Sequence, residues 1–449
     1  MEMEEKVRSL AFGGGGETEL HPIVIGILIL AFVFIFFKNQ RSYILPFILL
    51  VTFLLPISQR ISVLGLNFMV MRILILMGWA WIIIRADQYS FKLNNMDKCF
   101  IAWVSSNIIF YTVLWQDFGA FINRLGFALD SLGMYFLSRK MIREYQDIKN
   151  IFVTYAVISV LIAFCMINEH VSKENVFAIF GGVSEFSIIR GDRLRAQGPF
   201  LHALLAGSFA ASILPCIVSL WVNKGSSRYL VIVGSIAAIA MVFLTSSSGP
   251  IFMLFAGIFA LSLWPLRRIL AFIYLSAIVC VIFAHAIMKA PVWALLARIP
   301  LIEGSTGHHR YMLIDNFISR FDEWWFTGTR DYGNWGWMTW DVINQYISQG
   351  LNGGIITLSL FLIVLIIAFQ YVGRRMKLLE GHRKMQFVCW SVGASAFANS
   401  VGFFGIAYFD QTIIMWYVLL AIISSMETWA QENIIDAETI DHFQLPQSL

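Results

Sequence analysis

Three arginines lie close together in the segment Arg190-Gly-Asp-Arg-Leu-Arg-Ala-Gln-Gly-Pro-Phe-Leu-His202, directly ahead of a long apolar run. A guanidinium group stays charged at any working pH and donates paired hydrogen bonds to phosphate oxygens. Gly198-Pro199 sets a turn before the apolar run, and the free N–H groups at a helix start favour an anion. The segment therefore predicts a phosphate-binding role for at least one of Arg190, Arg193 and Arg195.

Ordinary ion pairing is the alternative explanation for this cluster. The nearest acidic side chains are Glu185 and Asp192, and lipid headgroups would serve equally well. In that case the arginines would have only a structural role.

A second cluster lies in the segment Thr306-Gly-His-His-Arg-Tyr-Met-Leu-Ile-Asp315. Apolar residues at positions 311, 314, 317, 318 and 321 suit an amphipathic helix on a membrane surface or over a helix bundle. Arg310 would stand at the N-terminal end of that helix. Two separate arginine clusters on one side of a membrane are what binding of a diphosphate requires.

Adjacent histidines, His308 and His309, raise the question of a metal site. Neighbouring positions on a helix point about 100° apart, and no third ligand follows at helical spacing as in an H-E-x-x-H motif. We therefore expect no metal site, and a proton-transfer role for one of the two histidines instead. Tryptophans of this region form either an interfacial belt or a stacking surface for sugar rings: 324, 325, 335, 337 and 340.

A third group of polar residues lies in Asp341-Val-Ile-Asn-Gln-Tyr-Ile-Ser-Gln-Gly350, before another apolar run. Asp341 is one helical turn from Asn344 and Gln345, so the three side chains could share one polar face. Asp341 is the candidate for a direct catalytic role. Simple capping of the following helix is the alternative for these residues.

Charges inside apolar runs are costly in a membrane and are candidates for function. Arg72, Arg124, Asp130 and Asp410 are the charges of this kind. Arg72 would bind a lipid-linked phosphate or pair with a buried acid, and Arg124 and Asp130 could neutralise each other or neighbours. Ser246-Ser-Ser-Gly-Pro250 is interpreted only as a tight turn between two spans.

The elements that must position these residues are apolar helices. The chain has 449 residues, of which 58% are hydrophobic and 13% charged, with a mean hydropathy of +0.72. Soluble domains carry about 25% charged residues, so most of this surface requires lipid as its solvent. The five cysteines lie in apolar runs without metal-ligand spacing and suggest neither a disulfide framework nor a zinc site.

A helix needs roughly 20 apolar residues to cross a bilayer. About thirteen stretches meet this requirement, at 21–37, 42–58, 62–84, 99–115, 118–138, 150–168, 200–222, 229–246, 249–265, 269–288, 351–372, 386–405 and 411–428. Every second connection is rich in lysine and arginine, and together these connections hold 18 of the 32 basic residues. Basic loops face the cytoplasm, so the other connections face outward.

The expected fold is an all-α, polytopic helix bundle of about 12–13 spans, in one membrane domain over residues 21–428. Two long connections, 169–199 and 289–350, would face outward, and the second would form a cap. Residues 1–20 are interpreted as a disordered lead outside the membrane, and residues 429–449 as a cytoplasmic tail.

Several motifs, taken in order, resemble the O-antigen ligase and polymerase family, and most of all its members that polymerise exopolysaccharides. The matching parts are Arg195-Ala-Gln-Gly-Pro-Phe-Leu-His202, the Ser-Ser-Ser-Gly-Pro turn, the long outer loop with Arg310, and Asn344-Gln-Tyr346-Ile before Gly-Leu-Asn-Gly-Gly. The resemblance covers roughly residues 40–428.

The resemblance implies a GT-C-type glycosyltransferase in the bacterial inner membrane, with its active site facing the periplasm. It implies that Arg195 and Arg310 bind the diphosphate of an undecaprenyl-diphosphate-linked glycan. Arg190, Arg193, His202, Asn344, Tyr346, Arg72 and Arg124 are further candidates for substrate binding. Ligases of the family carry a histidine directly before the Asn-x-Tyr motif, where this chain has Ile343. That departure argues against a plain lipopolysaccharide ligase and leaves Asp341, His308 and His309 as candidates for the base.

The expected reaction is an inverting transfer, in which an acceptor hydroxyl attacks the anomeric carbon and the diphosphate leaves, stabilised by arginine without a metal or other cofactor. Expected partners are the lipid-linked glycan, membrane lipid and other polysaccharide assembly proteins, without nucleic acid. The alternative from another class is a secondary transporter or flippase of lipid-linked glycan, although discontinuous helices in matching halves are not evident.

Overall fold

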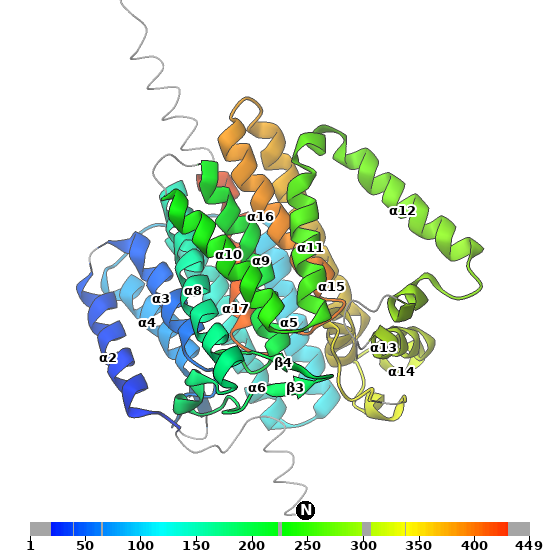
Figure 1. The fold of residues 1–449 in the computed structure, drawn as a ribbon, viewed down its shortest axis with the longest axis horizontal. Coiled ribbons are helices and arrows are strands. Elements are labelled where there is room, and N and C mark those ends of the chain that lie inside the picture. The colour runs from blue at the N-terminus through cyan, green and yellow to red at the C-terminus, as the bar shows by residue number, and fades with distance from the viewer. Residues whose placement is uncertain are drawn as a thin grey trace, which may run out of the picture.

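Long apolar helices make up most of the chain in the computed structural model, which describes residues 19–38, 40–63, 66–222, 227–298, 307–336 and 338–429 (Figure 1). The lead predicted over residues 1–20 and the tail predicted over 429–449 lie outside these residues, except at their inner ends. The helices are α2 (Pro22–Phe37), α3 (Ile44–Leu54), α4 (Val70–Ile84), α5 (Asn95–Trp115), α6 (Phe118–Ala128), α7 (Met134–Met141), α8 (Tyr145–Ser172), α9 (Ala203–Ser219), α10 (Arg228–Leu244), α11 (Ser248–Ser262), α12 (Leu270–Ile287), α13 (Gly307–Ser319), α14 (Phe321–Trp324), α15 (Gln345–Leu378), α16 (Arg383–Gly402) and α17 (Thr412–Ser424).

Four of the described helices are long and apolar enough to cross a membrane: α5, α8, the stretch Ala203–Val222 that begins with α9, and α15. Shorter apolar helices of 10–17 residues accompany them: α2, Arg41–Leu54, α4, α10, α11, Phe272–Ile287 and α17. The chain is therefore mainly helical, with the character of a membrane protein. Eleven of the thirteen predicted spans overlap one of these apolar helices, whereas the spans 118–138 and 386–405 fall on α6 with α7 and on α16, which are not among them.

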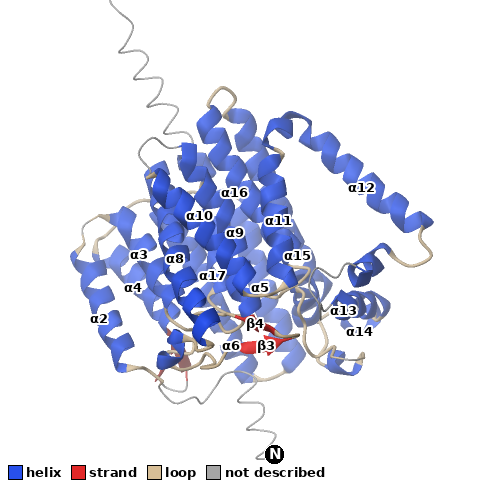
Figure 2. Cartoon of the chain, viewed as in Figure 1, coloured by secondary structure: helices blue, strands red, loops and turns tan. Residues whose placement is uncertain are grey.

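Strands interrupt the helical pattern at two places (Figure 2). β1 (Arg60–Val63) pairs antiparallel with β2 (Leu66–Met69), and β3 (Ile188–Arg190) pairs antiparallel with β4 (Arg193–Arg195). The predicted start of a span at residue 62 was wrong, because the end of β1 and the whole of β2 precede α4, which begins only at Val70. Ser58 Oγ donates to the carbonyl of Gly181, so both hairpins lie at the same end of the bundle, which we call the hairpin end.

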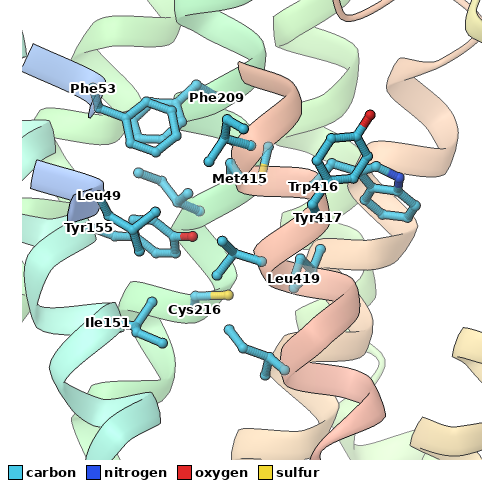
Figure 3. Packing of buried hydrophobic residues seen from close by; sticks show 14 of the residues in the cluster. Leu49, Phe53, Ile151, Tyr155, Phe209, Cys216, Met415, Trp416, Tyr417 and Leu419 are labelled. Carbon is cyan, nitrogen blue, oxygen red and sulfur yellow. The ribbon is translucent and has the colours of Figure 1, made fainter. Parts of the chain in front are cut away.

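Helix α9 lies at the centre of the bundle, packed by α8, α10, α11 and α16 (Figure 1). Small residues on α9 let its neighbours approach closely; a Cβ on Gly207 would lie 2.6 Å from Pro250 of α11. Larger side chains fill the core around it, and Phe209 stacks on Phe53 with ring centroids 4.3 Å apart (Figure 3). This packing holds the start of α11 beside the start of α9.

Charged connections meet at the opposite end of the bundle. Arg41 forms ion pairs with Glu144 at 3.0 Å and with Asp147 at 2.9 Å, and Arg143 pairs with Asp87. Deeper at this end, Arg139 binds both carboxylate oxygens of Asp97, each at 3.0 Å. Basic connections that are far apart in the sequence therefore come together, as the alternation of basic loops predicts.

Helices α13 and α14 and the residues up to 335 form a small cap at the hairpin end. Its own apolar core joins Leu313, Phe317, Trp324 and Trp335 to Ile347 and Leu351 of α15. Trp324 stacks on Phe317 with ring centroids 3.9 Å apart, so this tryptophan is a core residue and belongs to neither a lipid belt nor a sugar surface. Helix α13 confirms the helix predicted here, although Ile318 and Phe321 are exposed instead of packed.

A break in α15 anchors the cap. Gly353 and Gly354 leave helical geometry, and Gly354 has φ +67°. The break frees two backbone groups, which bond the cap: Thr329 N–H donates to Leu351 O at 3.0 Å, and Ile355 N–H donates to Trp325 O at 2.8 Å. This break in α15 was not predicted from the sequence, and the cap satisfies the groups that it frees.

Helix α12 stands apart from the bundle (Figure 1). Its principal contacts are with the 3-10 turns that flank it, and none of its described side chains is buried. Large apolar residues point outward all round it, among them Phe272, Leu275, Ile282 and Phe283. Such a helix suits contact with lipid on most of its surface.

Candidate anion-binding site

Two arginines from distant parts of the chain meet at the start of α11. Arg195 Nη2 donates to Ser247 Oγ at 2.7 Å, and Arg310 Nη1 lies 3.5 Å from Ser248 Oγ. Ser247 is the N-cap residue of α11 and Ser248 its first residue. Arg195, Arg310, Ser247, Ser248 and the nearby His202 are called the arginine site below.

Hairpin geometry places Arg195. Along β4, Arg193 is exposed at the tip of the hairpin, whereas Arg195 is only 8% exposed at its base. The base is attached to the turn between α10 and α11: Ala196 N–H donates to Leu244 O at 3.1 Å, and Ser246 Oγ donates to Leu194 O at 2.9 Å. The turn predicted to be only a connection therefore also holds Arg195 in place.

Glu169 fixes the Gln197-Gly198 turn that follows Arg195. Its buried carboxylate, on the last turns of α8, accepts hydrogen bonds from Gln197 N–H at 3.0 Å and Gly198 N–H at 2.9 Å. Gly198 has φ +57°, a conformation that glycine adopts without strain. Glu169 was not predicted as a site residue, because the outer connection was expected to begin at this position. An acid at the end of an apolar run was the available signal.

Arg310 reaches the site from the cap. A Cβ on Gly249 would lie 3.7 Å from its Nη2, and a Cβ on Gly405, in the connection between α16 and α17, would lie 3.5 Å from its Nε. The guanidinium group is thus enclosed by two glycines and is 8% exposed.

Neither guanidinium group has a counter-charge among the residues that the structure describes. None of the ion pairs in that part of the chain includes Arg195 or Arg310. The Nε atoms of both arginines are buried without a hydrogen-bond partner. Burial, together with the positive charge of the exposed Arg190, lowers the pKa of both groups.

Burying two cations without acids is unfavourable unless an anion completes the site. The start of α11 adds to the attraction, because its free N–H groups carry a partial positive charge. Two guanidinium groups, the hydroxyl of Ser248 and a helix start are therefore arranged to bind an anion with several oxygens, whereas the hydroxyl of Ser247 already donates to Thr245 O at 2.8 Å. Pairing of Arg195 with Glu185 or Asp192, the alternative considered for its cluster, is not among the ion pairs of the described residues.

His202 adds a neutral donor beside the arginines. It is the N-cap of α9, and its Nδ1 accepts a hydrogen bond from Leu204 N–H at 3.1 Å. Burial and the charges of Arg195 and Arg190 lower the pKa of the imidazole to about 4. The ring is therefore neutral near pH 7 with its proton on Nε2, which makes it a hydrogen-bond donor and a poor base.

Asp410 holds the far side of the same turn. Its two carboxylate oxygens accept hydrogen bonds from Thr412 N–H at 2.8 Å and Leu201 N–H at 3.2 Å. Burial raises the pKa of this carboxyl to about 6. Asp410 lies between α16 and α17 and not within a helix, and its bonds give it a structural role.

The other residues predicted for substrate binding near α15 serve mainly to position the helix. Asn344 caps α15 by accepting from Ile347 N–H at 3.1 Å, and Tyr346 donates its hydroxyl to Ser400 O at 2.8 Å. Capping, the alternative considered for this segment, is thus what Asn344 does.

The three candidates for the base lie in and beside the cap. His308 is exposed, and His309 is buried with its Nε2 3.0 Å from the carbonyl of Met338. Asp341 follows Met338 by three positions and precedes α15, so its predicted helical face with Asn344 and Gln345 is wrong. His309 of the cap and the backbone of Asp341 nevertheless both contact the carbonyl of Met338, so these two candidates lie near each other.

Arg72 and Asp130 form a buried ion pair. Arg72 Nε donates to Asp130 Oδ1 at 2.8 Å, and Nη2 donates to Oδ2 at 2.7 Å. Of the two roles considered for Arg72, the structure shows pairing with an acid. Arg124, in contrast, donates to Asn107 Oδ1 at 3.0 Å and lies over the ring of Tyr111, so its predicted neutralisation by Asp130 does not occur.

Comparisons with family models and with curated proteins find no match for this chain. Within the described residues, no group of three or more histidine, cysteine, aspartate or glutamate side chains is placed to hold a metal ion. The function is therefore inferred from the geometry of the arginine site.

Proposed function

We propose first a class: a membrane enzyme or carrier that binds a phosphorylated lipid at the arginine site. The observation that carries this proposal is the pair of buried guanidinium groups, each 8% exposed, at the start of α11 without an acid. Planar guanidinium groups suit phosphate oxygens, and two of them suit a diphosphate. The apolar helices around the site suit a lipid tail.

Within that class, we propose a glycosyltransferase of the O-antigen ligase and polymerase type, with a polytopic GT-C-like bundle and a periplasmic cap. It would join undecaprenyl-diphosphate-linked oligosaccharides into exopolysaccharide or O-antigen at the outer face of the bacterial inner membrane. Three of the four motifs that suggested this family meet at the site: the Arg195 segment, the serine turn and Arg310.

The residues would share the work of an inverting transfer. An acceptor hydroxyl forms a bond to the anomeric carbon, the bond from that carbon to the diphosphate oxygen breaks, and a base takes the hydroxyl proton. Arg195 and Arg310 would stabilise the charge that develops on the departing diphosphate, and His202 would donate to one of its oxygens. His309 in the cap and Asp341 beside the cap are the proposed candidates for the base, with His308 as the exposed third.

Removal of either arginine tests this proposal. Fixed donors that meet a developing charge are worth about 10²–10³-fold in rate each. We expect Arg195→Gln and Arg310→Gln to lower polymer formation by at least about 10²-fold. Purified protein would be incubated with a lipid-linked repeat unit and the products sized on a gel.

Arg320→Gln is the matched control for Arg310→Gln. Arg320 follows α13 on the surface and pairs with Glu323 at 2.9 Å, so its loss should leave polymer formation unchanged. Full polymer output from Arg195→Gln or Arg310→Gln would remove the assignment. Movement of lipid-linked units across vesicles without any change in glycan length would favour the flippase.

A further inference from the structure

Arg124, on α6, is a further guanidinium group that forms no ion pair with an acid among the described residues, and α6 carries no residue of the arginine site. Its Nη1 donates to Asn107 Oδ1 of α5 at 3.0 Å, and its Nε is buried without a hydrogen-bond partner. The guanidinium carbon lies 3.5 Å from the ring centroid of Tyr111 and 5.7 Å from that of Phe127. Aromatic faces attract the cation but leave its charge uncompensated.

The acidic residue on the same predicted span as Arg124 already pairs with another arginine. Asp130, on the same predicted span, gives both carboxylate oxygens to Arg72. That pair has no net charge, whereas the charge of Arg124 remains. An intramembrane arginine that no acid neutralises marks a binding site unless another role is found.

Cap residues lie against the outer end of the same helix pair. The guanidinium group of Arg330 lies over Trp115 at 5.4 Å, and Trp115 packs on Tyr111 with ring centroids 5.9 Å apart. Phe326 contacts Phe110 of α5 edge to face at 6.3 Å. A second cation and a row of aromatic rings thus connect Arg124 to the cap that carries Arg310.

The depth of Arg124 along α6 agrees with binding of a lipid phosphate. Arg124 is six positions after Phe118, the first residue of α6, and therefore about 9 Å from the hairpin end of that helix at 1.5 Å per residue. A long polar group at this depth is within reach of the membrane interface. Exposed apolar residues of α5 and α6, such as Ile109, Val113 and Leu125, would face the lipid tail.

We propose that Arg124 binds the phosphate of a second lipid-linked substrate, the acceptor. This inference rests on the proposed function, because joining two lipid-linked glycans requires two diphosphates to be held at once. The arginine site would hold the donor, whose diphosphate leaves, and Arg124 would hold the acceptor, whose diphosphate stays intact. A transferase with a soluble acceptor would need only the first site.

The experiment counts the undecaprenyl diphosphate molecules, without sugar, that bind to the full chain in detergent, by native mass spectrometry. We expect two per wild-type chain. Asn107→Asp places a carboxylate of nearly the same shape beside Arg124 and neutralises it from within. We expect this variant to bind one molecule, with at least tenfold weaker binding of the second.

Three further variants identify which site is lost. Arg195→Gln should lose the other molecule and keep the one at Arg124, and the double variant Arg195→Gln, Asn107→Asp should bind none. Arg124→Lys, which keeps the charge, should bind two. Because an added internal ion pair does not leave a cavity, Asn107→Asp should unfold at a temperature no lower than that of the wild type.

Several results would overturn the inference. Two molecules bound to Asn107→Asp, or only one bound to the wild type, would remove the site. So would displacement of the second molecule by an equal concentration of phosphatidylglycerol or of inorganic pyrophosphate, since the acceptor assignment requires preference for the polyprenyl diphosphate. If the proposed function is wrong instead, Arg195→Gln should still bind both molecules.

Discussion

Single residues of the site were partly predictable from residue type. Arginine beside a Gly-Pro turn indicates phosphate binding, and Arg195 and Arg310 do meet at one point. Which charge neutralises which was not predictable, because ion pairs join distant positions: Arg72 finds Asp130, 58 positions away, while Arg124 on the same predicted span as Asp130 does not. Ser247 and Ser248 were interpreted only as part of a turn, because the sequence does not show which side chains a hydroxyl contacts.

His202 gives a prediction at this scale. Its pKa falls from 6.5 to about 4 on folding, so below pH 6.5 the unfolded chain takes up a proton that the folded chain resists. The stability that the neutral ring contributes is therefore present above pH 6.5 and is lost as pH falls toward 4. The free energy of unfolding that is lost in this way amounts to about 3 kcal/mol.

His202→Asn keeps an N-cap acceptor for α9 but removes the titration. We expect thermal unfolding in detergent to show a smaller loss of stability between pH 7 and pH 4.5 in this variant than in the wild type. Asp410, with its pKa raised to about 6, titrates in both proteins and cancels in the comparison. Equal pH dependence of the two proteins would contradict the environment described for His202.

Among the elements, helices were predictable and their interruptions were not. Apolar runs located the helices because burial in lipid or core requires them, whereas the β1–β2 hairpin and the break in α15 depend on contacts made after folding. The break at Gly353 and Gly354 exists because the cap supplies Thr329 N–H and Trp325 O to the freed groups. Hydrogen bonds of this kind between two elements produce no periodic pattern in the sequence.

Gly354→Ala tests the role of that break. A Cβ at this position would lie 2.1 Å from Phe326 O, on a backbone with φ +67°. We expect a loss of at least about 1–2 kcal/mol in unfolding free energy, together with loss of polymer formation, since the cap that carries Arg310 would be displaced. Thermal unfolding and the polymer assay measure the two effects.

Gly373→Ala is the control on the same helix, because nothing lies within 4 Å of a Cβ at that position. It should be neutral or slightly stabilising, since alanine favours helix more than glycine does. Equal effects of the two substitutions would show that the break does not anchor the cap.

At the scale of the whole molecule, the alternation of basic connections was the most informative signal. Arg41 and Asp147, which come from two of these connections, are joined by an ion pair at one end of the bundle, whereas the Arg195 hairpin and the serine turn meet at the other. This arrangement follows because successive connections alternate between the two ends of the bundle, so it can be predicted without knowing any contact between helices. The side chains that fill the interface between cap and bundle, in contrast, can be identified only from the folded structure.

A labelling experiment tests the proposed orientation. Single cysteines at the exposed positions Glu185 and Asp322 should react with a membrane-impermeant maleimide in intact spheroplasts, in a background without the native cysteines. A cysteine at Glu380, in the connection between α15 and α16, should react only after permeabilisation. Opposite labelling of positions 185 and 322 would exclude a shared site for Arg195 and Arg310.

Two cations held at neighbouring serines, without an acid, repel each other across a medium of low dielectric. An arriving diphosphate relieves that repulsion, and after the glycan departs the spent carrier has gained one more ionised oxygen. The site would then bind the product more tightly than it binds the substrate. For an enzyme of the proposed type, departure of the used lipid would therefore set the pace of each cycle. A phosphatase that consumes the released diphosphate would keep the cycle turning.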